Sequence, residues 1–370
     1  MKQHITSRVL RSLCQALGIL LLTACATSTT QAPKMQDIPV FPPAPDEARF
    51  FYERTLYTSA DVSLEDKETS LRQKLLGESQ VGEGLSKPYG VAVYHGRVYV
   101  SDTGAQSVAV FDIPGQRYFK LDTEGEGQLR SPLGLDIDGK GQVYVVDGRI
   151  KAVKVFDAEG KYLRTLAADG EWFARPTGIA VDADGKRIYV VDTGGVETDK
   201  HHVLVFDAQT GEHLFKFSKR GSAPGELNLP RDITIGNDGL LYVVDGGNFR
   251  VQVFRPDGTF VRVFGSIGRQ GGQFSRPKEI SADADGNVYI VDTAFGNFQI
   301  FNPEGQLLLS VGGRSEKDGM AKYMLPSGIA IDGDGRVYMV DQFFRKVDVY
   351  RPAKLAANEG FTLKAVKPAK

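Results

Sequence analysis

Two acid–base dipeptides are the chain's strongest candidates for polar chemistry. Arg231-Asp232 and Lys278-Glu279 occupy the same place in two successive copies of a repeated phrase. Adjacent opposite charges can bind a charged or hydroxylated ligand, or they can neutralise each other among water molecules. Residue type leaves both readings open, so the place of these residues in the fold must be considered.

The other copies of the phrase carry different residues at these two positions. Where the acid stands they have a small residue, glycine in each case, and in place of the base they have uncharged residues, among them Tyr89. Glycine at this position indicates crowding near an axis. We therefore expect Asp232 and Glu279 at the mouth of a central channel, with Tyr89 beside them.

A second set of polar residues falls in the loops that follow the second strand of each repeat. Its main members are Asn248, Arg250 and Asn297, with Gln106 and Arg345 at related places. Amide and guanidinium groups can bond the carbonyl, peptide or sugar groups of a ligand, or they can cap the loop itself. The predicted binding residues are Arg231, Asp232, Lys278, Glu279, Tyr89, Asn248, Arg250 and Asn297.

Motifs for metal binding or nucleophilic catalysis are sparse. The loop at 193–203 holds Glu197, Asp199, His201 and His202, but adjacent His side chains on an extended segment point to opposite sides, which favours a polar surface loop. The DADG and DGDG segments lack the further ligands of a calcium loop, and between two strands they are typical hairpin turns. No nucleophile elbow, Ser-His-Asp order or phosphate loop is visible.

A recurring phrase organises the chain from residue 87 onward. It is clearest as RPTGIAVDADGKRIYVVD at 175–192, and six copies end in Asp at intervals of 45 to 53 residues. A hydrophobic strand, which in most copies ends in Val-Phe, follows each copy and leads in most of them to a Gly turn. Repeats of about 40–50 residues are typical of four-stranded propeller blades.

Each repeat predicts four strands joined by alternating short and long loops. Apolar residues on both faces of the second and third strands indicate a sheet packed between two neighbours. The short turns share one face of the ring, and the long connections share the other, which we predict to be the binding face. The Asp that ends strand two is predicted to cap loop backbone. The aromatic residues predicted to pack between blades are Tyr99, Tyr144, Tyr189, Tyr242, Tyr289, Tyr338, Phe111, Phe156, Phe206, Phe254, Phe301 and Tyr350.

The repeated pattern P-x-G-I-A-V-D-x-x-G-x-V-Y-V-V-D-x-x-x-x-R-V-x-V-F-D-x-x-G is similar to the NHL repeat, over residues 87–351. With the N-terminal features described below, the layout resembles the bacterial NHL-repeat lipoproteins. This resemblance implies an all-β fold, a six-bladed β-propeller of four-stranded antiparallel blades, which binds on one face or at the axis. It implies no single activity.

Two enzyme groups are built on related propellers. A chain similar to the peptide amidating lyases would need His on the inner strands to hold Zn²⁺, and the first strands have none. A chain similar to the gluconolactonase and paraoxonase group would need Glu, Asn and Asp around an axial Ca²⁺, which Glu279, Asp232 and Asp136 match only in part. A metal-dependent hydrolase or lyase is therefore the alternative function.

The N-terminus predicts export and lipid attachment. Lys2, Arg8 and Arg11 precede an apolar run, 13–22, which is too short for a mature membrane span, so residues 1–24 are predicted to be a signal peptide. The run ends in Leu-Thr-Ala-Cys, which looks like a lipobox with Cys25 as the lipidated residue. Cys14 would leave with the signal, so no disulfide is expected in the mature chain.

The remaining boundaries follow from composition and strand pattern. Residues 25–47 form a Pro-rich tether, 48–86 a closing strand and a short helix at 64–76, and 87–352 the propeller repeats, before a tail at 353–370. The last repeat lacks a clear fourth strand, so we predict that the aromatic strand at 49–58 supplies it. The segment 361–366 is the competing candidate.

These features predict a tethered, non-catalytic recognition or scaffolding module. Its partner would be an envelope protein, a peptide or a glycan. The lipid anchor would attach the protein to the outer membrane, and the propeller is expected to be monomeric. The net charge of −1 becomes about −4 without the signal peptide and shows no basic stripe, which argues against nucleic acid. No cofactor is predicted.

Overall fold

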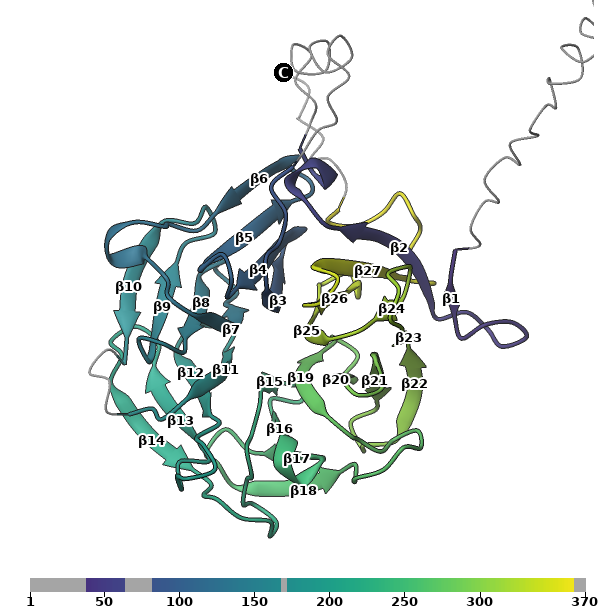
Figure 1. The fold of residues 1–370 in the computed structure, drawn as a ribbon. Coiled ribbons are helices and arrows are strands. Elements are labelled where there is room, and N and C mark those ends of the chain that lie inside the picture. The colour runs from purple at the N-terminus through teal and green to yellow at the C-terminus, as the bar shows by residue number, and fades with distance from the viewer. Residues whose placement is uncertain (1–37, 64–81, 168–171, 363–370) are drawn as a thin grey trace, which may run out of the picture. The chain divides into compact units, whose positions relative to one another are not determined.

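The computed structural model describes residues 38–63, 82–167 and 172–362, which form a ring of six antiparallel sheets (Figure 1). The first strands of neighbouring sheets contact one another round the whole ring, so they line the axis. Each sheet is a propeller blade with its first strand innermost. The predicted six-bladed β-propeller of four-stranded antiparallel blades is confirmed. Within the described ranges, no helix has the length and apolar character needed to cross a membrane.

The strands follow the chain from blade to blade. Blade one is β3 (Pro88–Tyr94), β4 (Arg97–Asp102), β5 (Ser107–Asp112) and β6 (Arg117–Lys120). Blade two is β7 (Pro132–Ile137), β8 (Val143–Asp147), β9 (Ala152–Phe156) and β10 (Tyr162–Leu166). Blade three is β11 (Pro176–Val181), β12 (Arg187–Asp192), β13 (His202–Asp207) and β14 (His213–Phe217).

The second half of the ring repeats this order until the last blade. Blade four is β15 (Ile233–Ile235), β16 (Leu241–Asp245), β17 (Arg250–Phe254) and β18 (Phe260–Phe264). Blade five is β19 (Pro277–Ala282), β20 (Val288–Asp292), β21 (Asn297–Phe301) and β22 (Leu307–Val311). Blade six is β25 (Pro326–Ile331), β26 (Val337–Asp341), β27 (Lys346–Pro352), β2 (Phe50–Leu56) and β1 (Val40–Phe41). A parallel pair, β23 (Gly313–Arg314) and β24 (Lys322–Tyr323), lies in the connection before blade six.

The core lies between neighbouring blades. Strands two and three of each blade are buried almost throughout, and clusters such as that of Val146, Val155, Ile188 and Phe206 join one blade to the next. All twelve recurring aromatic residues are buried, which confirms their predicted place in the core. In several blades the tyrosine hydroxyl also donates to the Asp of the hairpin turn between strands one and two, as Tyr289 does to Asp283 at 2.8 Å.

The Asp that ends strand two ties the long loops to each blade. Asp102 accepts hydrogen bonds from the backbone N–H groups of Ser86 and Lys87 before strand one, and from Gly104 and Ala105 after strand two. Most of the equivalent Asp residues make the same kind of bonds. The predicted capping role is confirmed. We call the face with these loops the long-loop face, and the opposite one the hairpin face.

The ring is closed by the N-terminal strand, as predicted. β2 pairs antiparallel with β27, and the register places Tyr52 opposite Tyr350 (Figure 1). β1 then pairs with β2, so Val40 and Phe41 belong to the last blade. The prediction of a tether up to residue 47 was therefore too long, because a short β-branched and aromatic pair can add to an open sheet edge. The predicted helix at 64–76 and Cys25 lie outside the described residues, as does most of 361–366.

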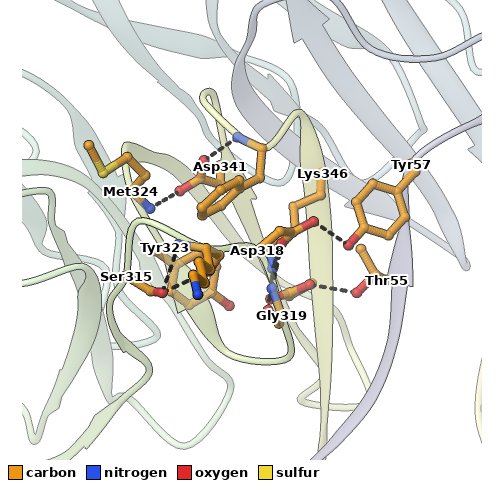
Figure 2. Close-up of polar contacts among 12 residues, drawn as sticks. Thr55, Tyr57, Ser315, Asp318, Gly319, Tyr323, Met324, Asp341 and Lys346 are labelled. Carbon is orange, nitrogen blue, oxygen red and sulfur yellow. Dashed lines mark hydrogen bonds and ion pairs between the residues drawn. The ribbon is translucent and has the colours of Figure 1, made fainter.

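A buried charge network joins the closing strand to blade six. Figure 2 shows Lys346 between Asp318 and the carbonyl of Gly319, which its Nζ contacts at 3.0 and 2.7 Å. The same ammonium group lies 3.0 Å from Asp348, whose carboxylate accepts a hydrogen bond from Thr55 of β2 at 2.7 Å. Lys346 and Asp348 are fully buried. Removal of the Lys346 charge would leave the Asp348 carboxylate without an opposite charge in the interior.

Candidate functional site at the axial mouth

The predicted acid–base dipeptides do lie at the axis. Arg231 lies two residues before strand one of blade four, and Lys278 stands at the start of strand one in blade five, both on the long-loop face. Lys278 Nζ lies 4.4 Å from the centroid of the Tyr89 ring in blade one. We call the opening lined by Tyr89, Arg231 and Lys278 the axial mouth.

Hydroxyl groups hold the backbone of this opening. Thr177 of blade three donates to the carbonyl of Arg231 at 2.8 Å, and Ser327 of blade six donates to the carbonyl of Tyr89 at 2.7 Å. Each bond crosses from one blade to the next near the axis. The mouth is therefore a preorganised part of the ring and not a free loop.

Two further arginines approach the axial mouth. Burial lowers the pKa of Arg231, and the nearby charges of Arg175 and Arg276 lower it further. Burial lowers the pKa of Lys278 to about 8, with Arg231 and Arg276 adding to the effect and Glu279 opposing it. Apart from the Lys278–Tyr89 contact, the side chains of these four basic residues make no hydrogen bond or ion pair with any described residue. The axial mouth thus gathers four cations that form no ion pair with a described residue, although the charges of Glu279 and Asp341 partly oppose the fall in the pKa of Lys278.

Carboxyl groups lie deeper, along the axis. Asp136 Oδ2 accepts a hydrogen bond from the Val181 N–H of the next blade at 2.8 Å, and Asp232 Oδ2 accepts one from Ile280 at 3.0 Å. The inner edge of each blade is not paired with another strand, so its N–H groups need such acceptors. Asp136 and Asp232 therefore join neighbouring blades, a role that the sequence did not indicate.

Burial changes the protonation of these carboxyl groups. It raises the pKa of Asp136 to about 6 and that of Asp232 to about 7. Burial also raises the pKa of Glu279 well above its usual value, and the neighbouring Asp232 adds to the rise. Glu279 Oε1 has no hydrogen-bond partner among the described residues. These groups line a narrow cavity of about 100 Å³ on the axis.

The predicted loop residues serve the fold. Arg250 pairs with Asp245 at 2.8 Å and donates to the carbonyls of Ala223 and Glu226. Asn248 donates to Asp245 as well. Both side chains clamp the connection between blades three and four, so they do not join the axial mouth.

The remaining loop candidates also lie apart from the axial mouth. Asn297 is half-buried, and its Oδ1 has no described partner. Gln106 and Arg345 take positive φ angles of 54° and 56° at the same turn position. Their contribution to the structure is that of turn residues.

The two adjacent histidines are buried, so the favoured reading of an exposed polar loop was wrong for them. His201 Nδ1 accepts from the Leu229 N–H at 3.2 Å and its Nε2 lies 3.0 Å from the Gly195 carbonyl. His202 points elsewhere, 3.9 Å from Asp192, and burial lowers its pKa to about 4. The opposite directions of the two rings agree with an extended segment. Among the described residues, no three His, Cys, Asp or Glu are grouped to hold a metal ion.

A family model for the NHL repeat matches residues 173–206 and 227–254. The chain contains NHL repeats. The RING finger protein nhl-1 of Caenorhabditis elegans is 48% identical over 52 residues, which are 14% of this chain and 5% of that protein. The human E3 ubiquitin-protein ligase NHLRC1 is 31% identical over 99 residues, 26% of this chain and 24% of that one. The matched stretches thus cover less than a quarter of the length of these curated relatives.

Solved structures with the same fold are more distant in sequence. A streptogramin B lyase superposes with a TM-score of 0.53 at 12% identity, over 72% of this chain and 94% of that one. The gluconolactonase XC5397 of Xanthomonas campestris has a TM-score of 0.54 at 17% identity, over 72% and 86%. At this identity the likeness shows the propeller fold alone.

Sequence reasoning missed two cations near the axial mouth, Arg175 and Arg276. Arg175 and Arg276 each precede the proline that opens strand one. A basic residue also stands there in copy one, as Lys87, so the signal was present in the alignment of the repeats. The differences between copies that stand out are at the residue after the proline, where copies four and five carry Arg231 and Lys278 and the rest are uncharged.

A larger cavity, of about 1010 Å³, lies on the hairpin face of the NHL propeller between blades five and six. Its lining includes Phe50, Tyr289 and Leu309, with Asp285 and Asp334 among its acidic residues. It contains none of the predicted binding residues. The volume of a cavity alone therefore does not identify the axial mouth as the candidate site.

Asp232→Asn is expected to stabilise the protein more at pH 8 than at pH 5. Since burial raises the pKa of Asp232 to about 7, the folded protein keeps a proton that the unfolded chain loses at about pH 4. Stability therefore falls as pH rises between these values. Asparagine keeps an acceptor for Ile280 and has no charge to bury.

Thermal melts at both pH values measure this effect. Asp257→Asn, in an exposed turn where hydrogen bonds with Thr259 lower the pKa of Asp257, is the control and should show no such gain. A difference between Asp232→Asn and the parent that does not grow with pH would contradict the assignment.

Proposed function

We propose that this protein is a non-catalytic recognition or scaffolding propeller, which binds a protein, peptide or glycan on its long-loop face through an anionic group. The observation that carries the proposal is the axial mouth, where Lys278 lies 4.4 Å from the Tyr89 ring centroid and the side chains of Arg175, Arg231, Arg276 and Lys278 form no ion pair with a described residue. Gathering like charges costs free energy, and an anion bound among them would recover it.

The geometry suits a carboxylate, phosphate or sulfate group. Guanidinium groups bind such anions through two parallel hydrogen bonds, and a half-buried ammonium adds a further charge-assisted bond. The side chains of Asp232 and Glu279 line the axial cavity below, and neither forms an ion pair with Arg231 or Lys278, so the charge of Glu279 only partly offsets that of Lys278. Neutralisation within each dipeptide is therefore incomplete.

Double substitution of Arg231 and Lys278 to Ala tests the proposal. We expect at least about 100-fold weaker capture of the crosslinked partner from membranes, a loss of about 2.7 kcal/mol in binding, because two half-buried charges of the axial mouth are removed. The melting temperature should be unchanged or slightly higher, since repulsion is relieved.

Lys186→Ala with Lys354→Ala is the matched control. It removes the same charge from the hairpin face, where both lysines form exposed ion pairs with Asp184 and Asp285. Capture should persist in this control. Equal capture by the axial-mouth variant and its parent would show that the ligand binds elsewhere.

The alternative is a metal-dependent hydrolase or lyase that acts at the axis. The unpartnered Oε1 of Glu279 near Asp232 favours it, because such an oxygen is free to accept a ligand. The metal content of purified protein separates the two functions. Stoichiometric Ca²⁺ or Zn²⁺, lost in Asp232→Asn with Glu279→Gln, would support the enzyme.

The proposed setting is the cell envelope, with the chain anchored by lipid at Cys25. Support comes from the sequence at 1–25, where a basic start, an apolar run and Leu-Thr-Ala-Cys follow one another. Multiple acyl chains on one residue give stable membrane attachment. Palmitate labelling of the full chain, compared with Cys25→Ser, tests this attachment.

A further inference from the structure

The long-loop face holds large apolar side chains in solvent. Phe343 and Ile150 stand in the loops between strands two and three of blades six and two, and Val196 in that of blade three. Ile267 stands in the connection from blade four to blade five. Their exposed fractions are 69% for Val196, 66% for Ile267, 57% for Phe343 and 37% for Ile150.

These side chains are held in place by ordered backbone. The N–H of Phe343 donates to Asp341 at 2.8 Å, and that of Ile150 donates to Asp147 at 3.2 Å. The ring of Phe343 also packs edge-on against Phe344 at 5.3 Å. Exposed side chains on ordered backbone lose little conformational freedom when a partner covers them, which favours binding.

The other two apolar residues stand on equally well-anchored loops. Arg220 donates to the carbonyl of Val196 at 2.8 Å, and Ile267 forms a β-bridge with Phe274. The anchors come from the neighbouring connections and not from the residues' own side chains. Their exposure is therefore a property of the folded loops.

Basic residues accompany part of this apolar set. Arg149 and Lys151 flank Ile150, and Arg345 follows the Phe343–Phe344 pair. Acidic residues of the same face, such as Glu124 and Glu316, stand in the connections between blades, and Glu197 lies beside Val196. The charge that faces a ligand at the axis is positive, with apolar groups around it.

We infer that the ligand of the long-loop face is a protein, recognised through an acidic side chain with apolar side chains near it. The inference rests on the proposed function and selects one ligand class from it. A loop after strand two lies about 7 Å outward from strand one, the distance that two residues of an extended peptide span. Aliphatic groups such as Val196 and Ile267 gain from burial against other apolar groups, which hydroxyl-rich glycans offer poorly.

Selection from a random 12-residue peptide library against the immobilised full chain tests the inference. Selected peptides should carry Asp or Glu with an apolar residue two or more positions away. Their affinity should fall about tenfold in Phe343→Ser and in Val196→Ser, and further in Arg231→Ala with Lys278→Ala. Leu163→Ser, an exposed apolar position on the outer strand β10, is the matched control and should bind as the parent does.

An oligogalacturonate serves as the glycan probe beside the peptides. The protein partner is refuted, and the proposed function stands, if the oligogalacturonate binds through Arg231 and Lys278 while no peptide is selected. The same conclusion follows if the oligogalacturonate binds in this way while Phe343→Ser and Val196→Ser leave peptide affinity unchanged. If peptides are selected whose binding ignores every long-loop-face variant, both are refuted. Thermal melts of each variant confirm that the fold is kept.

Discussion

Lys346→Met should lower the free energy of unfolding by about 3–5 kcal/mol, the usual cost of leaving a buried charge without its partner. The Lys346 ammonium contacts Asp318, Asp348 and the Gly319 carbonyl, and the side chain is fully buried (Figure 2). Methionine fills a similar volume but donates nothing. A fall of roughly 10 °C in melting temperature is expected.

The pH dependence of Lys346→Met gives a second measure. Burial raises the pKa of Asp348, while Lys346 and Thr55 hold it down. Without the ammonium group the pKa of Asp348 rises further, so the deficit of the variant should be larger at pH 8 than at pH 5, where the carboxyl group takes up a proton.

Lys354→Met is the matched control for this substitution. Lys354 forms an ion pair with Asp285 at 2.9 Å, but both side chains are exposed. Such pairs contribute about 0–1 kcal/mol. Similar losses in Lys346→Met and Lys354→Met would show that the network at the closure does not stabilise the ring.

Deletion of residues 38–56 should abolish cooperative folding. The deleted segment supplies β1 and β2, and with them the buried side chains of Phe50, Tyr52 and Leu56. At about 1.5–3 kcal/mol for each large apolar side chain, together with the lost ladder, the cost approaches the total stability of a typical domain, about 5–15 kcal/mol. The bare β27 edge would also promote aggregation.

Deletion of residues 361–370 is the control for the closing strand. It removes the segment 361–366, the competing candidate for the closing strand. Among the described residues, this deletion removes mainly the packing of Phe361 against His95. Circular dichroism melts and size-exclusion profiles compare the two deletions. A cooperative melt of the 38–56 deletion close to that of the parent would mean that β2 is dispensable.

Much of the architecture could be predicted because the same pattern of apolar strand residues and turn residues recurs in six repeats. Tyr189, for example, stands among apolar residues in a strand that is buried on both faces, and its equivalents in the other repeats stand in the same surroundings. An aromatic residue that recurs at one place in every blade has to pack between blades. The last repeat lacks a clear fourth strand of its own, and its sheet edge must be covered, so the aromatic strand at 49–58 was predicted to complete the blade in preference to 361–366.

The candidate site was predicted only in part. Arg231 and Lys278 were placed at the axis because strand one is innermost in every blade. For Arg250 the sequence left ligand binding and loop capping open, and in the structure it pairs with Asp245 and donates to the connection between blades three and four. The two-residue period of a strand predicts the face of the sheet from which a side chain projects. It does not predict which loop covers that face and accepts the hydrogen bonds of the side chain.

The sequence by itself determined the number of blades, the burial of the recurring aromatics and the face on which the long loops gather, since each depends on local period and repetition. Only the tertiary structure decided which charges are left without partners. Pairing depends on contacts between residues far apart in the chain, such as Thr55 with Asp348 and Asp136 with Val181. Arg231 and Lys278 form no ion pair with Asp232 and Glu279, because these acids, although adjacent in sequence, line the axial cavity below.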